Sequence, residues 1–156
     1  MISVRRATKE DAERLLAWAN DPATRAAGFE PSPIDQRTHG LWLEERLASP
    51  TTRIFIGLEG DKPVGQVRLE ADPAGRVEVG ISVAPEARGR GIGRSLLDAG
   101  LAAGVADPDL RVAVFVARIR PDNAASIALF GGAGFRRTGT DEVAGIACLI
   151  YGRAVV

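Results

Sequence analysis

The stretch VEVGISVAPEARGRGIGR, residues 77–94, decides how this chain folds. Its first part alternates apolar residues with small or polar ones and predicts a strand over residues 76–83. Its last part begins a helix, because apolar residues recur at helical spacing from Ile92 to about Val105. The turn between them carries glycines at positions 89, 91 and 93. Glycine admits positive φ and lets a ligand approach the backbone closely, so this turn is a candidate binding loop.

The start of the predicted helix is suited to anions. The first N–H groups of a helix have no intrahelical acceptor and carry partial positive charge, which favours phosphate oxygens. Arg88, Arg90 and Arg94 flank the glycines and can add charge-assisted hydrogen bonds. A P-loop would need Gly-Lys-Ser/Thr, and a dinucleotide fingerprint would need Gly-x-Gly-x-x-Gly, so neither pattern fits. The alternative to a phosphate site is a glycine-rich turn that only packs the helix on the strand.

Strands and helices on both sides of this stretch predict a mixed α+β fold. Turn formers connect the segments 53–58, 63–70 and 76–83, so we expect these strands to form an antiparallel meander. The segment 110–119 is rich in Val and is typical of a buried central strand. The other predicted elements are strands at 2–7, 135–140 and 146–151, helices at 8–19, 38–48 and 122–134, and a loop at 23–37. The expected architecture is a mixed sheet of about seven strands with four helices.

Composition excludes several classes of protein. The chain has 156 residues, 46% of them hydrophobic and 26% charged, values that are ordinary for a globular domain and not for a disordered one. Twenty basic and twenty acidic residues cancel, which disfavours nucleic acid and anionic membranes as partners. Cys148 and His39 are the only residues of their types, so no Cys/His metal site can form. Without a signal peptide or membrane span in the sequence, we expect a soluble, cytoplasmic single domain over residues 1–156.

Two blocks of sequence resemble a known family. Arg88-x-x-Gly91-x-Gly93, preceded by Val83-Ala84-Pro85, resembles the acetyl-coenzyme A signature of the GNAT superfamily of N-acetyltransferases. The segment from Asn123 to Phe130, followed by Gly134-Phe135, is similar to a second GNAT block. The blocks have the order and separation of that superfamily, and the predicted elements extend the resemblance over nearly the whole chain.

The resemblance implies a cleft for acetyl-coenzyme A where the fourth and fifth strands splay apart. The diphosphate would then contact the amides and side chains of residues 88–94, and the pantetheine arm would pair with the backbone of residues 81–83. The opposite wall would come from the second block. The implied cofactor-binding residues are Ile81, Ser82, Val83, Arg88, Gly89, Arg90, Gly91, Ile92, Gly93, Arg94, Asn123, Ser126 and Phe130.

Catalytic groups are harder to assign. Members of the family polarise the thioester carbonyl with a backbone N–H at a bulge in the fourth strand, here near Ser82 or Val83, and Gly80 is compatible with a bulge. Glu78 is the candidate base, because strand alternation places it on the face of Ser82. The alternative is a solvent-side glutamate paired with Arg68.

The proton for the departing thiolate also lacks an obvious source. Ribosomal-protein alanine acetyltransferases carry a Tyr acid where this chain has Phe130, and Arg118 stands near the position of their Glu base. Solvent, Ser126 or Tyr151 would have to supply the proton, or the thiolate leaves unassisted.

The acceptor residues are predicted from Trp18 and Asn20 at the end of the first helix and from His39 and Trp42 in the second. This pattern resembles the nucleotide-linked amino-sugar N-acetyltransferases, and aromatic faces suit sugar rings. The alternative is that these residues serve packing. The expected function is N-acetylation of a small polar amine, with an amino sugar as the leading candidate. The alternatives are acetylation of a protein N-terminus or an amino-acid-like metabolite, and a non-catalytic acyl-coenzyme A-binding domain.

Overall fold

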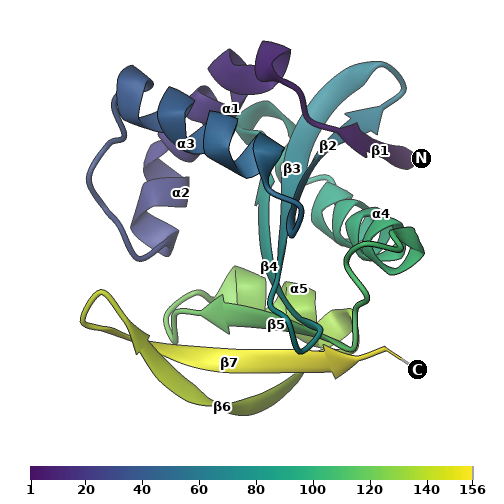
Figure 1. The fold of residues 1–156 in the computed structure, drawn as a ribbon. Helices are drawn as coiled ribbons and strands as arrows, with labels where there is room; N and C mark the ends of the chain where they lie inside the picture. The colour runs from purple at the N-terminus through teal and green to yellow at the C-terminus, as the bar shows by residue number, and fades with distance from the viewer. Residues whose placement is uncertain (156) are drawn as a thin grey trace.

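The computed structural model describes residues 1–155 and contains one seven-stranded sheet in the order β1-β2-β3-β4-β5-β7-β6. Figure 1 shows α1, α2 and α3 on one side of strands β2–β4, with α4 on the other side. Two short 3₁₀ helices cover Lys9–Asp11 and Pro85–Ala87. The strands are β1 Ile2–Arg6, β2 Thr52–Glu59, β3 Lys62–Ala71, β4 Arg76–Val83, β5 Val114–Ile119, β6 Arg136–Val143 and β7 Ile146–Ala154. The helices are α1 Ala12–Ala19, α2 Pro22–Ala27, α3 Gln36–Ala48, α4 Ile92–Ala106 and α5 Ala124–Gly132.

The sheet opens between β4 and β5, as the resemblance implied. Strands β1 to β4 pair in antiparallel fashion, and so do β5, β7 and β6. The parallel pairing of β4 with β5 covers only residues 76–78 and 114–116. Beyond Glu78 the two strands have no register with each other, and Figure 1 shows β5–β7 turned away from β2–β4. The mixed α+β class and the splayed sheet are therefore confirmed.

Helix α4 lies close against the sheet because of its sequence pattern. Ile92, Leu96 and Leu101 are buried on one face, at the helical spacing that predicted the helix. Gly100 faces β3, where a Cβ would meet the Val67 side chain at 2.8 Å. The absence of a side chain at Gly100 therefore sets how close the helix comes to the sheet.

The prediction of a loop over residues 23–37 was correct for residues 28–35 and wrong at both ends. Pro22–Ala27 form α2, and α3 begins at Gln36 instead of Thr38, so the described residues contain five α-helices where four were expected. Asp21 caps α2 through Oδ2, which accepts the N–H of Thr24 at 3.1 Å. Pro22 occupies the first helical position, where proline is favoured because its missing N–H would have no intrahelical partner.

Strand β5 is shorter than predicted. It begins at Val114, whereas the sequence predicted a strand from Leu110. Arg111 has φ of 48°, a left-handed conformation that breaks extended structure. Leu110 is buried and holds this connection on the core.

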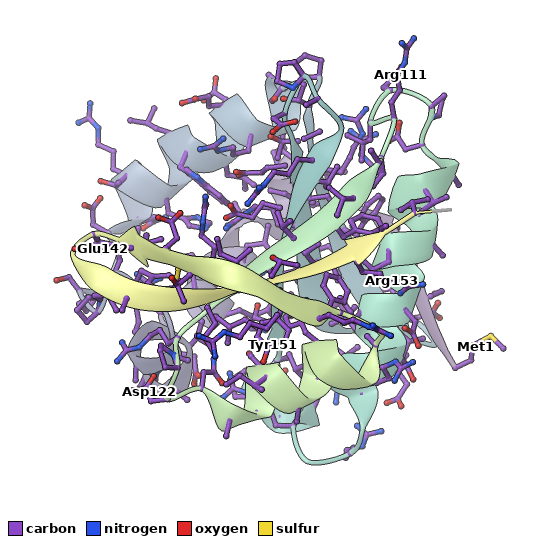
Figure 2. The ribbon with its side chains drawn as sticks, turned by 90° about the horizontal axis from the view of Figure 1, so that it is seen from below. Met1, Arg111, Asp122, Glu142, Tyr151 and Arg153 are labelled. Atoms are coloured by element: carbon purple, nitrogen blue, oxygen red, sulfur yellow. The ribbon has the colours of Figure 1, made fainter. Side chains whose placement is uncertain are left out.

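The β6–β7 hairpin and α5 close the other end of the sheet. Figure 2 looks onto the hairpin, with α5 beside it and Arg153 near the end of that helix. Arg153 Nη1 donates to the carbonyl oxygen of Ala133, directly after α5, at 3.2 Å. None of the helices in residues 1–155 has the length and hydropathy needed to cross a lipid bilayer.

Candidate active site

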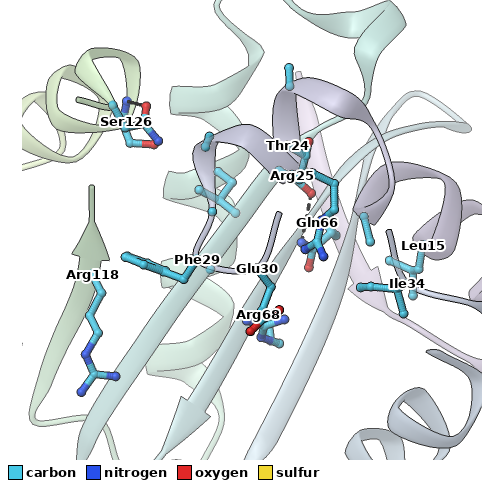
Figure 3. A pocket seen from close by; sticks show the side chains of 18 of the residues that line it. Leu15, Thr24, Arg25, Phe29, Glu30, Ile34, Gln66, Arg68, Arg118 and Ser126 are labelled. Atoms are coloured by element: carbon cyan, nitrogen blue, oxygen red, sulfur yellow. Dashed lines mark hydrogen bonds between the residues drawn. The ribbon is translucent and has the colours of Figure 1, made fainter. Parts of the chain in front are cut away.

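The opening between β4 and β5 belongs to a large cavity of about 1030 Å³. Its walls come from β3, β4 and β5, the first turns of α5, helix α3, and the segment between α1 and α3. Figure 3 shows Ser126 on one side, Gln66 and Arg68 on the sheet, and Phe29 and Glu30 on the segment that faces them. The cavity thus joins the predicted cofactor cleft to the predicted acceptor region.

The structure brings about half of the predicted site residues into this cavity. Those that line it are Ile81, Ser82, Val83, Arg88, Asn123, Ser126, Phe130, His39 and Trp42. Those that do not line it are Gly89, Arg90, Gly91, Ile92, Gly93, Arg94, Glu78, Trp18 and Asn20. The loop 89–94 lies at the rim, because a Cβ on Gly93 would lie 3.8 Å from Val83 and 3.7 Å from Leu129, which are both wall residues.

The N–H groups of residues 89–94 are not used by the protein. Within residues 1–155, none of these N–H groups donates a hydrogen bond to a backbone or side-chain acceptor, and no side chain caps α4. Gly89 and Gly91 are exposed and have φ of 77° and 74°. This left-handed backbone is accessible to glycine without strain and turns the chain into the helix. The arrangement offers an anion a set of backbone donors at the positive end of a 15-residue helix.

Each arginine of the loop already has a carboxylate partner. Nη2 of Arg88 lies 2.8 Å from Oδ2 of Asp21, and Nη2 of Arg90 lies 2.8 Å from Oε1 of Glu59. Arg94 pairs with Asp98 one helical turn later, at 3.0 Å. The hydrogen bonds from Arg88 and Arg90 lower the pKa of Asp21 and of Glu59. A bound phosphate would have to share these guanidinium groups with protein carboxylates, which the sequence did not indicate.

The edge of β4 that faces the opening is regular. Ala84 donates its N–H to the carbonyl of Val64 at 2.8 Å, and pairs alternate along an antiparallel ladder. The backbone groups of Ile81 and Val83 therefore point away from β3, toward the opening. The bulge that we expected near Gly80 is absent, since β3 and β4 keep one register from Gly65–Val83 to Ala71–Val77. Gly80 instead leaves room for Arg68, whose Nη2 would lie 3.4 Å from a Cβ there.

Helix α5 supplies the opposite wall. Asn123 caps the helix through Oδ1, which accepts the N–H of Ser126 at 3.1 Å. Phe130 is buried and meets Phe135 edge-on, with ring centroids 5.0 Å apart. Asn123 and Phe130 thus hold the wall in place, and the hydroxyl of Ser126 is left as its polar group on the cavity. Tyr151 lies outside the lining of the cavity.

Glu78 is not among the residues that line the cavity. Its carboxylate accepts a hydrogen bond from Nη1 of Arg118 on β5, and the Nη2 of Arg118 lies 3.5 Å from Asp141. The alternative partner considered from the sequence, Arg68, pairs with Glu70 instead. Ser82 is better placed, because its Oγ accepts a hydrogen bond from Gln66 at 3.0 Å and both residues line the cavity.

An aromatic wall stands at the far end of the cavity, on α3. His39 and Trp42 pack against each other with ring centroids 5.5 Å apart, and both line the cavity. His39 is buried, which lowers its pKa and keeps the imidazole neutral at neutral pH. The guanidinium groups of Arg46 and Arg68 lie over the Trp42 ring at 5.9 and 5.5 Å.

Trp18 and Asn20, predicted as acceptor residues, have structural roles. Trp18 is buried in the main core. The side-chain amide of Asn20 exchanges two hydrogen bonds of 2.7 Å with the backbone N–H and carbonyl of Ile34. Trp18 lies three residues after the buried Leu15, on the apolar face of α1, and Asn20 is the residue that follows the helix.

Phe29, Gln66 and Arg120 are among the residues of the cavity wall that sequence reasoning missed. Phe29 comes from the segment that was expected to be a plain loop, and Figure 3 shows its ring between the α5 side and the sheet. Gln66 positions Ser82, and Arg120 holds the backbone carbonyls of Ala26 and Gly28. A long-range contact of this kind leaves no local pattern in the sequence.

Comparisons with known proteins agree with this geometry. Residues 2–136 match the family described as "Acetyltransferase (GNAT) domain". Mycothiol acetyltransferase of Mycobacterium marinum is 30% identical over 162 aligned positions, which cover 90% of this chain. The chain spans about half (48%) of the length of that curated relative.

Solved structures share the fold. A ribosomal-protein-alanine N-acetyltransferase from Brucella melitensis is 30% identical, with a TM-score of 0.81 over 97% of this chain and 99% of its own. The aminoglycoside acetyltransferase AAC(6')-Ib, in complex with coenzyme A, superposes with a TM-score of 0.85 at 18% identity, covering 99% of this chain and 95% of that one. The family match over most of the chain, together with the splayed sheet and the free amides, shows that this protein belongs to the GNAT family of acetyltransferases.

Proposed function

We propose that this chain transfers an acetyl group from acetyl-coenzyme A to the primary amine of a small polar acceptor, and that a nucleotide-linked amino sugar is the leading candidate. The observation that carries the first part is the run of unpaired N–H groups at residues 89–94. They lie at the rim of a cavity that continues along the exposed edge of β4. A diphosphate fits the amides, and an extended pantetheine arm fits the strand edge.

The chain's own groups would serve the transfer as follows. Acetyl-coenzyme A would bring the thioester, whose carbonyl oxygen must be polarised while the acceptor amine is neutral. The backbone N–H groups of β4 at Ile81 and Val83 face the opening and are the proposed donors to that oxygen. Ser82, held by Gln66, and Ser126 are the hydroxyls on the cavity wall that can relay protons. Phe130 has no proton to donate, so the thiolate would take its proton from Ser126 or from solvent.

Glu78 remains a proposed base under one condition, that its pair with Arg118 opens during the reaction. Replacing it by glutamine tests this role. If Glu78 is the base, the loss of turnover in Glu78→Gln is larger at low pH than at high pH. An effect that does not depend on pH would mean that Glu78 has a structural role, in its pair with Arg118 between β4 and β5.

The acceptor end of the cavity supports a sugar. Trp42 and His39 give an aromatic wall of two rings tilted by 38° to each other, and aromatic faces suit sugar rings and nucleobases. The guanidinium groups of Arg46 and Arg68 beside it suit the phosphate oxygens of a nucleotide-linked sugar. A second candidate acceptor is a protein N-terminus, which the 30% identity to the ribosomal-protein-alanine N-acetyltransferase favours.

Thiol release from acetyl-coenzyme A in the presence of an amine panel tests the proposal. The panel contains a nucleotide-linked amino sugar, an aminoglycoside and a peptide with an N-terminal alanine. We expect steady turnover with the first of these, and a rise of about tenfold or more in the KM for acetyl-coenzyme A in Arg88→Ala. Arg136→Ala, an exposed arginine of β6, is the control and should leave that KM unchanged. Coenzyme A binding without turnover on any amine would support a binding-only domain instead.

A further inference from the structure

Residues 20–34, which we call the lid, form a segment that is held together by hydrogen bonds between its own residues. The two hydrogen bonds between Asn20 and Ile34 close its base. Inside it, Nη1 of Arg25 donates to the carbonyl of Ser32 at 3.1 Å. Helix α2, at the centre of the lid, has no buried residue. Apolar burial therefore contributes little to holding the lid in place, and its polar contacts with the rest of the protein decide its position.

Two arginines from across the cavity hold the lid. Arg88, from the glycine-rich loop, binds its first turn through Oδ2 of Asp21 at 2.8 Å and Oγ1 of Thr24 at 3.1 Å. Arg120, at the end of β5, donates to the carbonyls of Ala26 and Gly28 at 3.2 and 3.1 Å. Both arginines line the cavity, so the lid is fixed over it at both ends of α2.

The two attachments differ in what a bound diphosphate would do to them. Arg120 bonds to neutral carbonyls and keeps Asp122 as its own carboxylate partner at 3.1 Å. Arg88 bonds to the carboxylate of Asp21, and Arg88 is also the residue proposed to meet the diphosphate. A diphosphate on Arg88 would compete with Asp21 for the same guanidinium and would repel that carboxylate.

We propose that the Arg88–Asp21 pair is a latch on the lid, and that coenzyme A opens the lid by drawing Arg88 away from Asp21. This inference rests on the proposed diphosphate site. The first turn of α2 then swings free while Arg120 and the Asn20–Ile34 pair act as the hinge. Because residues of the lid line the cavity, release of the latch by coenzyme A would change the cavity wall.

Asp21→Asn tests the latch with little change to the helix, because asparagine caps a helix as well as aspartate does. Hydrogen exchange of the amides of residues 22–30 and calorimetry with coenzyme A are measured on the full chain. In the wild type, we expect coenzyme A to raise exchange in this segment by about threefold or more. In Asp21→Asn, exchange is already raised without ligand, and coenzyme A binds about two- to fivefold more tightly because no latch has to open.

Asp98→Asn is the matched control. It removes the carboxylate partner of Arg94 in the same loop without touching the lid. Exchange at residues 22–30 should stay at the wild-type level in this variant. Protection of residues 22–30 by coenzyme A, or weaker binding in Asp21→Asn, would overturn the latch.

The latch can fail without the proposed function failing. If coenzyme A binds and Arg88→Ala weakens that binding while exchange at residues 22–30 does not respond, the latch is wrong and the diphosphate site stands. If coenzyme A does not bind the wild-type chain, the proposed function itself is wrong.

Discussion

The two ends of the cavity are built in different ways. At the loop end, the groups that would recognise a ligand are the N–H groups of residues 89–94, aimed by left-handed glycines within one short loop. At the α3 end, they are side chains of His39, Trp42, Arg46 and Arg68, which come from two separate elements. The first site can be predicted from one short stretch of sequence. The second forms only when distant segments of the chain pack together. Four substitutions test this difference between the two ends.

We expect the largest effect on stability for Trp18→Ala, which tests whether Trp18 belongs to the core and not to the acceptor site. Trp18 is buried in the core, so truncation should lower the free energy of unfolding by about 3–5 kcal/mol, measured by urea denaturation. The KM for the acceptor should not change in the folded protein. A stable variant with a raised acceptor KM would return Trp18 to the binding site.

Gly91→Val tests the loop end. Valine is strained at φ of 74°, so the backbone must shift and the amides lose their common direction. We expect the Kd for coenzyme A, measured by calorimetry, to rise about 10- to 100-fold. Gly40→Val is the control, since Gly40 lies in α3 outside this cavity with open space around it. An unchanged Kd in Gly91→Val would mean that the amides do not hold the ligand.

Trp42→Ala tests the α3 end. Loss of the aromatic wall should raise the KM for the acceptor about tenfold and leave the KM for acetyl-coenzyme A unchanged, as measured by steady-state kinetics. Leu41→Ala is the neighbouring control, because Leu41 is 60% exposed and lies outside the cavity. A rise in the KM for acetyl-coenzyme A alone would mean that Trp42 contacts the cofactor and not the acceptor.

The smallest effect is expected at His39. Burial lowers its pKa in the folded state, so the unfolded chain takes up a proton at higher pH than the folded one does. The free energy of unfolding should therefore fall as the pH drops through about 6.5 and level off below the folded-state pKa. His39→Gln should flatten this part of the pH dependence, as measured by urea titrations at several pH values. Equal slopes in the two proteins would show that His39 titrates alike in both states.

The same contrast explains what the sequence could predict. Strand alternation and the spacing of Ile92, Leu96 and Leu101 were enough for the sheet and for α4. The glycines at 89 and 91 indicated the turn, because a positive φ depends mainly on the residue type at that position. Helix α2 was missed because Pro22 can end one helix or begin the next, and the choice depends on the cap from Asp21.

Contacts between distant segments could not be predicted from the sequence. The pairs Arg88–Asp21 and Glu78–Arg118 join residues far apart in the chain, and each arginine had several carboxylates to choose from. Trp18 and Trp42 look alike in the sequence, yet one lies in the core and the other on the cavity. Only the packing of α1 and α3 on the sheet separates these roles.

The central claim is that the backbone amides of residues 89–94 receive the diphosphate of coenzyme A. Titrating isotope-labelled protein with coenzyme A and following each amide resonance by NMR tests it directly. We predict that the largest shifts fall on the amides of Gly89, Arg90, Gly91, Ile92 and Gly93. The claim would be contradicted if these five resonances did not shift while resonances elsewhere in the protein titrated to saturation.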